Sequence, residues 1–154
     1  MIQALIFAAV LAAAPVEEPV DPYIQSDANA GTAPFEGEAM LKAFHGRVGI
    51  DRVVDATVDR SIADPRIRDI FEGHDLVRLR RTVKEQFCYI LNGGCAYSGR
   101  DMAASHKDLG LQNADFNAFV EHLQAAMDHE GVGFRAQNRF LAKLAPMQRT
   151  TVER

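Results

Sequence analysis

The sequence predicts an all-α fold, and three observations support this expectation. Apolar residues recur three or four positions apart through most of the chain, which is the spacing of one helix face. Between residues 37 and 145 the only proline is Pro65, so few positions forbid a helix. The strict polar–apolar alternation of a half-buried strand is missing from this region.

The first expected helix spans about residues 50–62, because its apolar residues recur at helical spacing. Asp64 and Pro65 follow it as a cap and a first-turn proline, which indicates a short helix that ends near Phe71. Asp75 is a suitable cap for the next helix, and the glycines of Asn92-Gly93-Gly94 end that helix.

The sequence of the second half of the chain predicts three more helices. A short one covers about residues 100–107, and a strongly amphipathic one begins at Asn113 or Asp115. The glycines of Gly131-Val132-Gly133 end that helix, and the last helix must bend or accept strain at Pro146.

Composition and length indicate one globular domain with two segments before it. The 154 residues are 47% hydrophobic, and a net charge of −4 gives no basic footprint, which argues against a nucleic-acid partner. Residues 1–14 form an apolar run typical of a signal peptide and too short for a transmembrane span. The alternatives are an uncleaved apolar tail and a mis-assigned start. Residues 15–37 are rich in proline and acidic residues and predict a flexible linker, and residues 38–154 form the domain.

Common catalytic and metal-binding templates do not fit this sequence. The five histidines do not occur in pairs at zinc-binding spacing, and no serine lies in a nucleophile-elbow pattern. His106 differs from the other histidines because it lies in a short predicted helix bounded by glycines, with Met102 one turn before it and Leu109 after it. By spacing alone it is either an ordinary structural histidine or a ligand.

Several fragments, in order over residues 40–152, resemble group I of the truncated haemoglobins. They are Ala63-Asp-Pro-Arg-Ile-Arg-Asp-Ile-Phe71, Asp75-Leu-Val-Arg-Leu79, Asn92-Gly-Gly-Cys95, Tyr97-Ser-Gly-Arg-Asp-Met-Ala-Ala-Ser-His106, Leu109-Gly-Leu111 with Asp115-Phe116, and Leu141-Ala-Lys-Leu-Ala-Pro146. The resemblance implies a globin-like two-over-two helical sandwich around haem b. It also implies that His106 is the proximal ligand of the iron. The residues expected to line the cofactor are Phe71, Leu79, Val83, Tyr97, Met102, Phe116 and Phe119.

The expected distal pocket departs from the family pattern. The family commonly has Phe-Tyr in the second helix, with a tyrosine hydroxyl that donates a hydrogen bond to bound oxygen, whereas this chain has Thr57-Val58. The expected distal residues are Val58, Leu79, Thr82 and Val83, and only Thr82 carries a hydroxyl. This departure puts tight oxygen storage and efficient NO dioxygenation in doubt.

The two cysteines, Cys88 and Cys95, are either a disulfide or two buried thiols. An unbroken helix would hold residues seven apart about 10 Å from each other along its axis, too far for a disulfide. The Asn92-Gly93-Gly94 turn between them permits closer approach. A disulfide would require an oxidising compartment, which agrees with a periplasmic or secreted protein, and the alternative is a cytoplasmic one.

The leading functional interpretation is a haem protein that binds a diatomic ligand (O2, NO or CO) at iron, with a redox protein as a further partner. One rival is a globin-fold interaction or regulatory module without productive haem binding. Another is a haem-dependent enzyme that detoxifies NO or peroxide. The sequence does not decide between carrier, sensor and enzyme.

Overall fold

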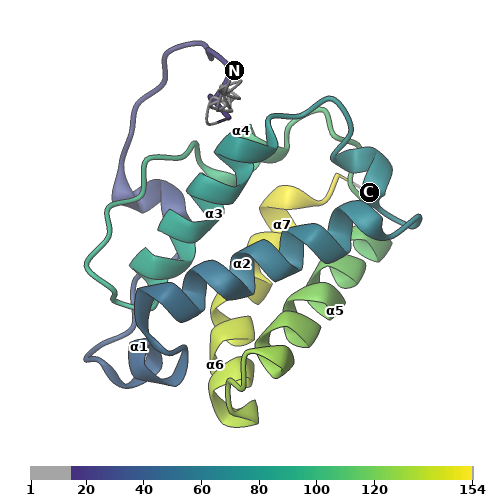
Figure 1. Ribbon diagram of the computed structural model, residues 1–154. Coiled ribbons are helices and arrows are strands. Elements are labelled where there is room, and N and C mark those ends of the chain that lie inside the picture. Colours follow the sequence, from purple (N-terminus) through teal and green to yellow (C-terminus); the bar gives the residue numbers. More distant parts are fainter. Residues whose placement is uncertain (1–14, 154) are drawn as a thin grey trace, which may run out of the picture.

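The computed structural model describes residues 15–153 and contains only helices and loops within that range. The chain is coloured from purple at its start to yellow at its end in Figure 1. The α-helices and 3-10 helices, in chain order, are η1 (Asp27–Ala30), α1 (Ala39–Ala43), α2 (Gly46–Ala63), η2 (Arg68–Ile70), α3 (Leu76–Ile90), α4 (Met102–His106), α5 (Asn113–His129), α6 (Phe134–Leu144), η3 (Ala145–Met147) and α7 (Gln148–Thr151). The all-α prediction is confirmed.

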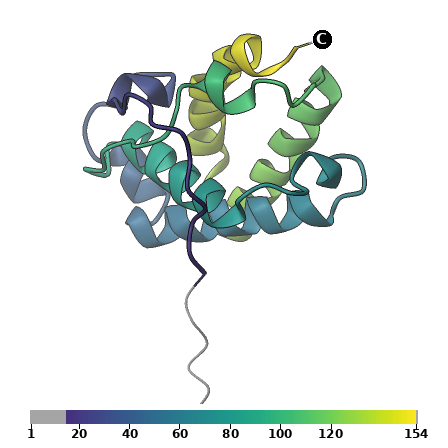
Figure 2. The same ribbon diagram turned by 90° about the horizontal axis from the view of Figure 1, so that it is seen from above.

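Two helix pairs form the body of the domain (Figures 1 and 2). One pair is α2 with α3, and the other is α5 with α6. Helix α2 also packs against α5, and this contact joins the two pairs. The core between them includes three phenylalanines, since the Phe140 ring meets the ring of Phe44 at 5.1 Å and that of Phe87 at 4.8 Å, both edge to face. Such pairs add to the stabilisation that burial alone provides.

Helix α2 begins four residues before the expected position, where two consecutive residues with positive φ, the residue before α2 and its first residue, turn the chain out of α1. His45 has φ 59° and Gly46 has φ 71°. Within α2, Gly49 packs so closely on the end of α1 that an added Cβ would lie 1.9 Å from the Phe44 carbonyl oxygen. A glycine is therefore required where α1 and α2 meet.

The segment after α2 differs from the expected short helix. Asp64 ends α2, and only the single 3-10 turn η2 forms before Phe71. The Asp64 carboxylate accepts hydrogen bonds from the backbone N–H and the guanidinium of Arg66, both at 2.9 Å. The side chain that we expected to start a helix thus folds a turn, which is a common alternative for aspartate.

Three helix ends agree with the sequence. Asp75 caps α3 by accepting a hydrogen bond of 2.9 Å from the Arg78 N–H. After α3, Asn92 has φ 61° and reverses the chain. The final helical stretch breaks at the expected proline, because α6 ends at Leu144 and continues as the 3-10 turn η3, which contains Pro146.

Residues 15–37, here named the N-terminal arm, differ from the predicted flexible linker. The structure lays this arm against the helical domain, and its Ala30 is fully buried. Polar contacts hold it, because the Phe35 N–H donates to the Ile90 carbonyl at 2.8 Å and Glu17 pairs with Arg78 and Arg81. The composition of the arm indicates how little apolar surface it can bury, but it does not indicate these long-range polar contacts.

The structure joins Cys88, on the last turn of α3, to Cys95 by a disulfide, with 5.7 Å between their α-carbons. This is the first of the two alternatives that the sequence left open. The signal-peptide prediction falls on residues 1–14, which lie outside the described residues. Among residues 15–153, no helix has the length and apolar character needed to cross a membrane.

Candidate functional site

His106 is the last residue of α4, a helix of only five residues. Asp101 caps the start of this helix by accepting a hydrogen bond of 2.8 Å from the Ala104 N–H. Helix α4 packs against α7 at the C-terminal end of the chain. The last turn of a short, capped helix therefore carries the imidazole.

The two nitrogens of the His106 ring have different environments. Nδ1 lies 2.7 Å from the Met102 carbonyl oxygen. Because a carbonyl can only accept, Nδ1 carries the proton and Nε2 keeps its lone pair. In residues 15–153 the structure shows no hydrogen bond to Nε2. Burial lowers the pKa of His106 below its usual value, although the hydrogen bond to Met102 acts in the opposite direction. A neutral imidazole with a free Nε2 is the form that ligates a metal.

The expected proximal wall comes from α4 and α5. Met102 is buried one turn before His106, and Phe116 and Phe119 lie three positions apart on α5, both half-buried. Phe71, just after η2, is also half-buried. Figure 2 shows α4 beside the C-terminal helices, in agreement with its packing against α7. Half-buried aromatic side chains are the kind of surface that a flat apolar group such as a porphyrin covers.

The expected distal residues belong to two packed helices. Leu79, Thr82 and Val83 share one face of α3, because positions three and four apart do so. Leu79 and Val83 pack against the core cluster that contains Val58 of α2. Leu79 and Val83 thus belong to the same apolar core as Val58, and Thr82 shares their face of α3.

The polar groups near the distal residues already have partners. The Thr82 hydroxyl lies 3.0 Å from the Arg78 carbonyl and 3.2 Å from the Leu79 carbonyl. A hydroxyl has one proton, and Thr82 donates it to its own helix. The long cations of α3 are also occupied in ion pairs, which are Arg80 with Asp55 and Asp59, Lys84 with Asp55, and Arg81 with Glu17 and Glu85.

Tyr97, which the resemblance implies to line the cofactor, is a buried residue just before α4. It lies in the loop between α3 and α4 (residues 91–101, named the α3–α4 loop), and its hydroxyl donates to the Arg100 carbonyl at 3.0 Å. Burial raises the pKa of Tyr97 to about 12. An added Cβ on Gly99 would lie 2.2 Å from the Tyr97 oxygen, so glycine permits this tight loop. The contacts of the Tyr97 hydroxyl therefore serve the loop that leads to His106.

The sequence analysis missed Gln86, a buried polar residue of α3. Its Nε2 donates to the Ala30 carbonyl at 2.9 Å and lies 3.4 Å from the Met102 sulfur. It also lies 3.8 Å from the Met147 sulfur. The signal that could have identified it was a polar side chain within the apolar stripe of α3. Its hydrogen bond to Ala30 of the N-terminal arm could not be predicted from spacing.

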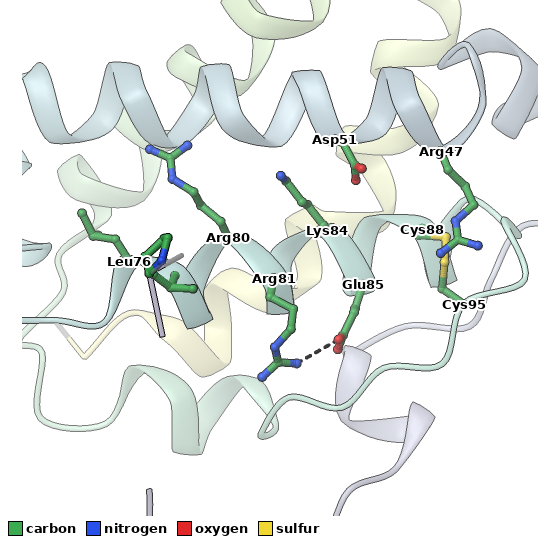
Figure 3. A pocket seen from close by; sticks show the side chains of 11 residues that line it. Arg47, Asp51, Leu76, Arg80, Arg81, Lys84, Glu85, Cys88 and Cys95 are labelled. Carbon is green, nitrogen blue, oxygen red and sulfur yellow. Dashed lines mark hydrogen bonds and ion pairs between the residues drawn. A yellow bond between two sulfur atoms is a disulfide. The ribbon is translucent and has the colours of Figure 1, made fainter. Parts of the chain in front are cut away.

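A separate cavity of about 500 Å3 lies beside α3 on a face lined by charged side chains (Figure 3). Arg47, Arg81 and Glu85 are among its lining residues, together with the disulfide. Of the expected site residues, only Cys88 and Cys95 line this cavity. Its charged walls do not suit a porphyrin, so the cavity is not the expected haem site.

Comparison with known proteins places the chain among the globins. The sequence model of the family described as bacterial-like globin matches residues 39–153. A group 1 truncated haemoglobin of Nostoc commune is 30% identical over 103 residues, which cover 67% of this chain and 87% of that protein. A group 1 truncated haemoglobin of Synechocystis is 33% identical over 97 residues, with coverage of 60% and 78%.

Solved structures support the predicted fold. The crystal structure of truncated haemoglobin from Tetrahymena pyriformis in its Fe(III) form superimposes with a TM-score of 0.71 at 22% identity. The match covers 75% of this chain and 98% of that one. A truncated oxygen-avid haemoglobin from Bacillus subtilis gives a TM-score of 0.65 at 24% identity, with coverage of 75% and 99%. The two-over-two prediction is therefore confirmed.

Proposed function

This chain belongs to the bacterial-like globin family, and we propose that it is a haem protein in which His106 Nε2 is the axial ligand of the iron. The observation that carries the proposal is the hydrogen bond of 2.7 Å between His106 Nδ1 and the Met102 carbonyl. Histidines that ligate metals usually donate their other ring N–H to such a partner, which fixes the tautomer and the direction of the ring.

The surrounding residues suit haem b. Phe71, Phe116 and Phe119 are half-buried aromatic residues that a porphyrin would cover. When bound, haem would supply an iron atom with a position open to a further small ligand. This chain's residues then orient the imidazole, keep it neutral and exclude water from the cofactor.

The ligand proposed for the open position is a diatomic gas, namely O2, NO or CO. Val58, Leu79 and Val83 are aliphatic, and Thr82 donates its proton to its own helix. Ligand selection therefore rests mainly on access and on the low polarity of the pocket. A redox protein that reduces the iron is a proposed partner.

The proposal is tested by the absorption spectrum of the full chain, expressed with a supply of haem or titrated with it. We expect a Soret band that saturates at one haem per chain. His106→Ala should weaken binding strongly, whereas His74→Ala, which removes another histidine, should leave it unchanged. No Soret band in the native protein would contradict the proposal and favour the interaction module without haem. Rapid peroxide or NO turnover by the haem form would instead indicate the detoxifying enzyme.

A further inference from the structure

The N-terminal arm makes hydrogen bonds to the α3–α4 loop, which leads directly to the helix of His106. Three arm side chains each bind a backbone group, and the three groups belong to consecutive loop residues. The Tyr97 N–H donates to Asp27 Oδ1 at 2.7 Å, Tyr23 Oη donates to the Ser98 carbonyl at 2.7 Å, and Asn29 Nδ2 donates to the Gly99 carbonyl at 3.2 Å. The arm therefore fixes the path of the loop just before α4.

The end of the arm also contacts α4 through Met102, whose carbonyl orients the His106 ring. An added Cβ on Gly31 would lie 3.3 Å from Met102 Cγ, so the arm backbone touches this side chain. Gln86 connects the two segments, because its amide donates to the Ala30 carbonyl and lies 3.4 Å from the Met102 sulfur.

Helix α4 needs such external support because it is very short. A helix of five residues is far below the roughly 12–15 residues at which isolated helices become even marginally stable. The disulfide of Cys95 fixes the loop near its beginning, and Asp101 caps the helix itself. Between these two points the side chains of the arm add the contacts described above, beside those that Ser98 makes with Glu85 of α3.

We propose that Asp27 and Asn29 are positioning residues for His106. By holding the α3–α4 loop, they keep α4 folded and its imidazole aimed toward the cofactor. The effect on the iron rests on the proposed function, whereas the effect on α4 does not. The arm is thus part of the axial-ligand support, although it lies outside the residues 39–153 that match the globin family.

The test uses the full chain and near-isosteric variants. Asp27→Ala removes the acceptor for the Tyr97 N–H, and Asp27→Asn keeps an oxygen at the same place and should restore the native behaviour. Asn29→Asp removes the donor for the Gly99 carbonyl without changing the size of the side chain. Gln25→Ala is the matched control, because Gln25 is an exposed residue of the same arm.

Two measurements are made on each variant. Hydrogen exchange followed by mass spectrometry reports on amides 102–109, and resonance Raman spectroscopy of the ferrous haem form reports the iron–histidine stretching band. Loss of one hydrogen bond predicts roughly two- to tenfold faster exchange in α4. We expect that acceleration and a shifted or broadened band in Asp27→Ala and Asn29→Asp, with native values in Asp27→Asn and Gln25→Ala.

Unchanged exchange in both disruptive variants would overturn the proposal. Faster exchange with an unchanged iron–histidine band would also overturn it, since the arm would then stabilise α4 without positioning His106. A native protein that binds no haem would refute the proposed function. In that case the hydrogen-exchange data alone would decide whether the arm stabilises α4. Faster exchange confined to residues 95–109 would show that it does.

Discussion

At the scale of single residues, the surroundings of the His106 ring explain how the fold could present a metal ligand. The hydrogen bond from Nδ1 to Met102 fixes the ring, and burial holds the pKa of the imidazole below its usual value. Burial favours the neutral ring, and the hydrogen bond at Nδ1 leaves Nε2 as the nitrogen with the free lone pair. The environment of this histidine is therefore suited to ligation of a metal.

Oxygen bound opposite His106 should dissociate quickly. Val58 and Leu79 have no donor, and Thr82 donates to a carbonyl of its own helix. A missing hydrogen bond is worth about 0.5–1.5 kcal/mol, or roughly 1.5–3 kcal/mol when it is charge-assisted. The expected effect is a roughly twofold to hundredfold faster release than with a donor present.

Stopped-flow displacement of oxygen by carbon monoxide measures this rate. Val58→Tyr should slow the release by supplying a hydroxyl, and Val58→Phe is the control of similar size without one. Slow release already in the native protein would show that another side chain supplies the bond.

At the scale of elements, the α3–α4 loop is the segment on which the site depends most. It carries Cys95, it is tied to the N-terminal arm, and it ends at the cap of α4. The hydroxyl and N–H of Ser98 also donate to Glu85 of α3, at 2.6 and 3.0 Å. Contacts from the N-terminal arm and from α3 thus hold this loop, which has no regular secondary structure.

Removal of the disulfide should destabilise the fold. Closing so short a loop stabilises the folded state by about 2–3 kcal/mol in the chain-entropy model. We expect the double variant Cys88→Ser/Cys95→Ser to lose about this much free energy of unfolding in urea. Reductant should lower the stability of the native protein similarly and leave the double variant unchanged. Equal stability of all forms would contradict this prediction.

The turn after α2 should depend on pH through Asp64. Hydrogen bonds from Arg66, and to a lesser extent from His122, hold the pKa of Asp64 well below its usual range. An aspartate with a lowered pKa stabilises the fold above its unfolded pKa of about 3.9, and the contribution is lost as the pH falls through the folded pKa. Asp64→Asn should therefore lower the Tm more at about pH 5 than at about pH 3. An equal loss at both pH values would show that the charge is not responsible.

Most helices could be predicted from the sequence because strong local signals mark their ends. Asp75 caps the start of α3 as expected, and Asn92 reverses the chain just after the end of this helix. Asp64 was interpreted wrongly, since the same side chain can cap a helix or fold a turn. The candidate ligand His106 followed from a resemblance, whereas its partner, the Met102 carbonyl, became evident only from the folded α4.

The long-range polar contacts of the N-terminal arm could not be predicted. Asp27 lies seventy residues from Tyr97, and Gln86 lies fifty-six residues from Ala30. Periodicity reports only on neighbours within one element. For the same reason the proline-rich composition suggested a flexible segment, although the structure shows a packed one.

At the scale of the whole molecule, the disulfide and the apolar residues 1–14 point to the same compartment. We propose that the protein works in the periplasm or outside the cell, where disulfides persist. Protein purified from its native compartment should then contain no free thiols after denaturation without reductant. Its mass should lack the apolar segment. Two free thiols would contradict the disulfide and weaken the proposed localisation.

The proposed function requires that His106 holds the iron of the haem. The most direct measurement is the absorption spectrum of His106→Gly, recorded with increasing imidazole. We expect weak haem binding that free imidazole restores, because the ligand would enter the space left by the ring, and His74→Gly should behave as the native protein. A native Soret band and stoichiometry in His106→Gly without imidazole would contradict the claim.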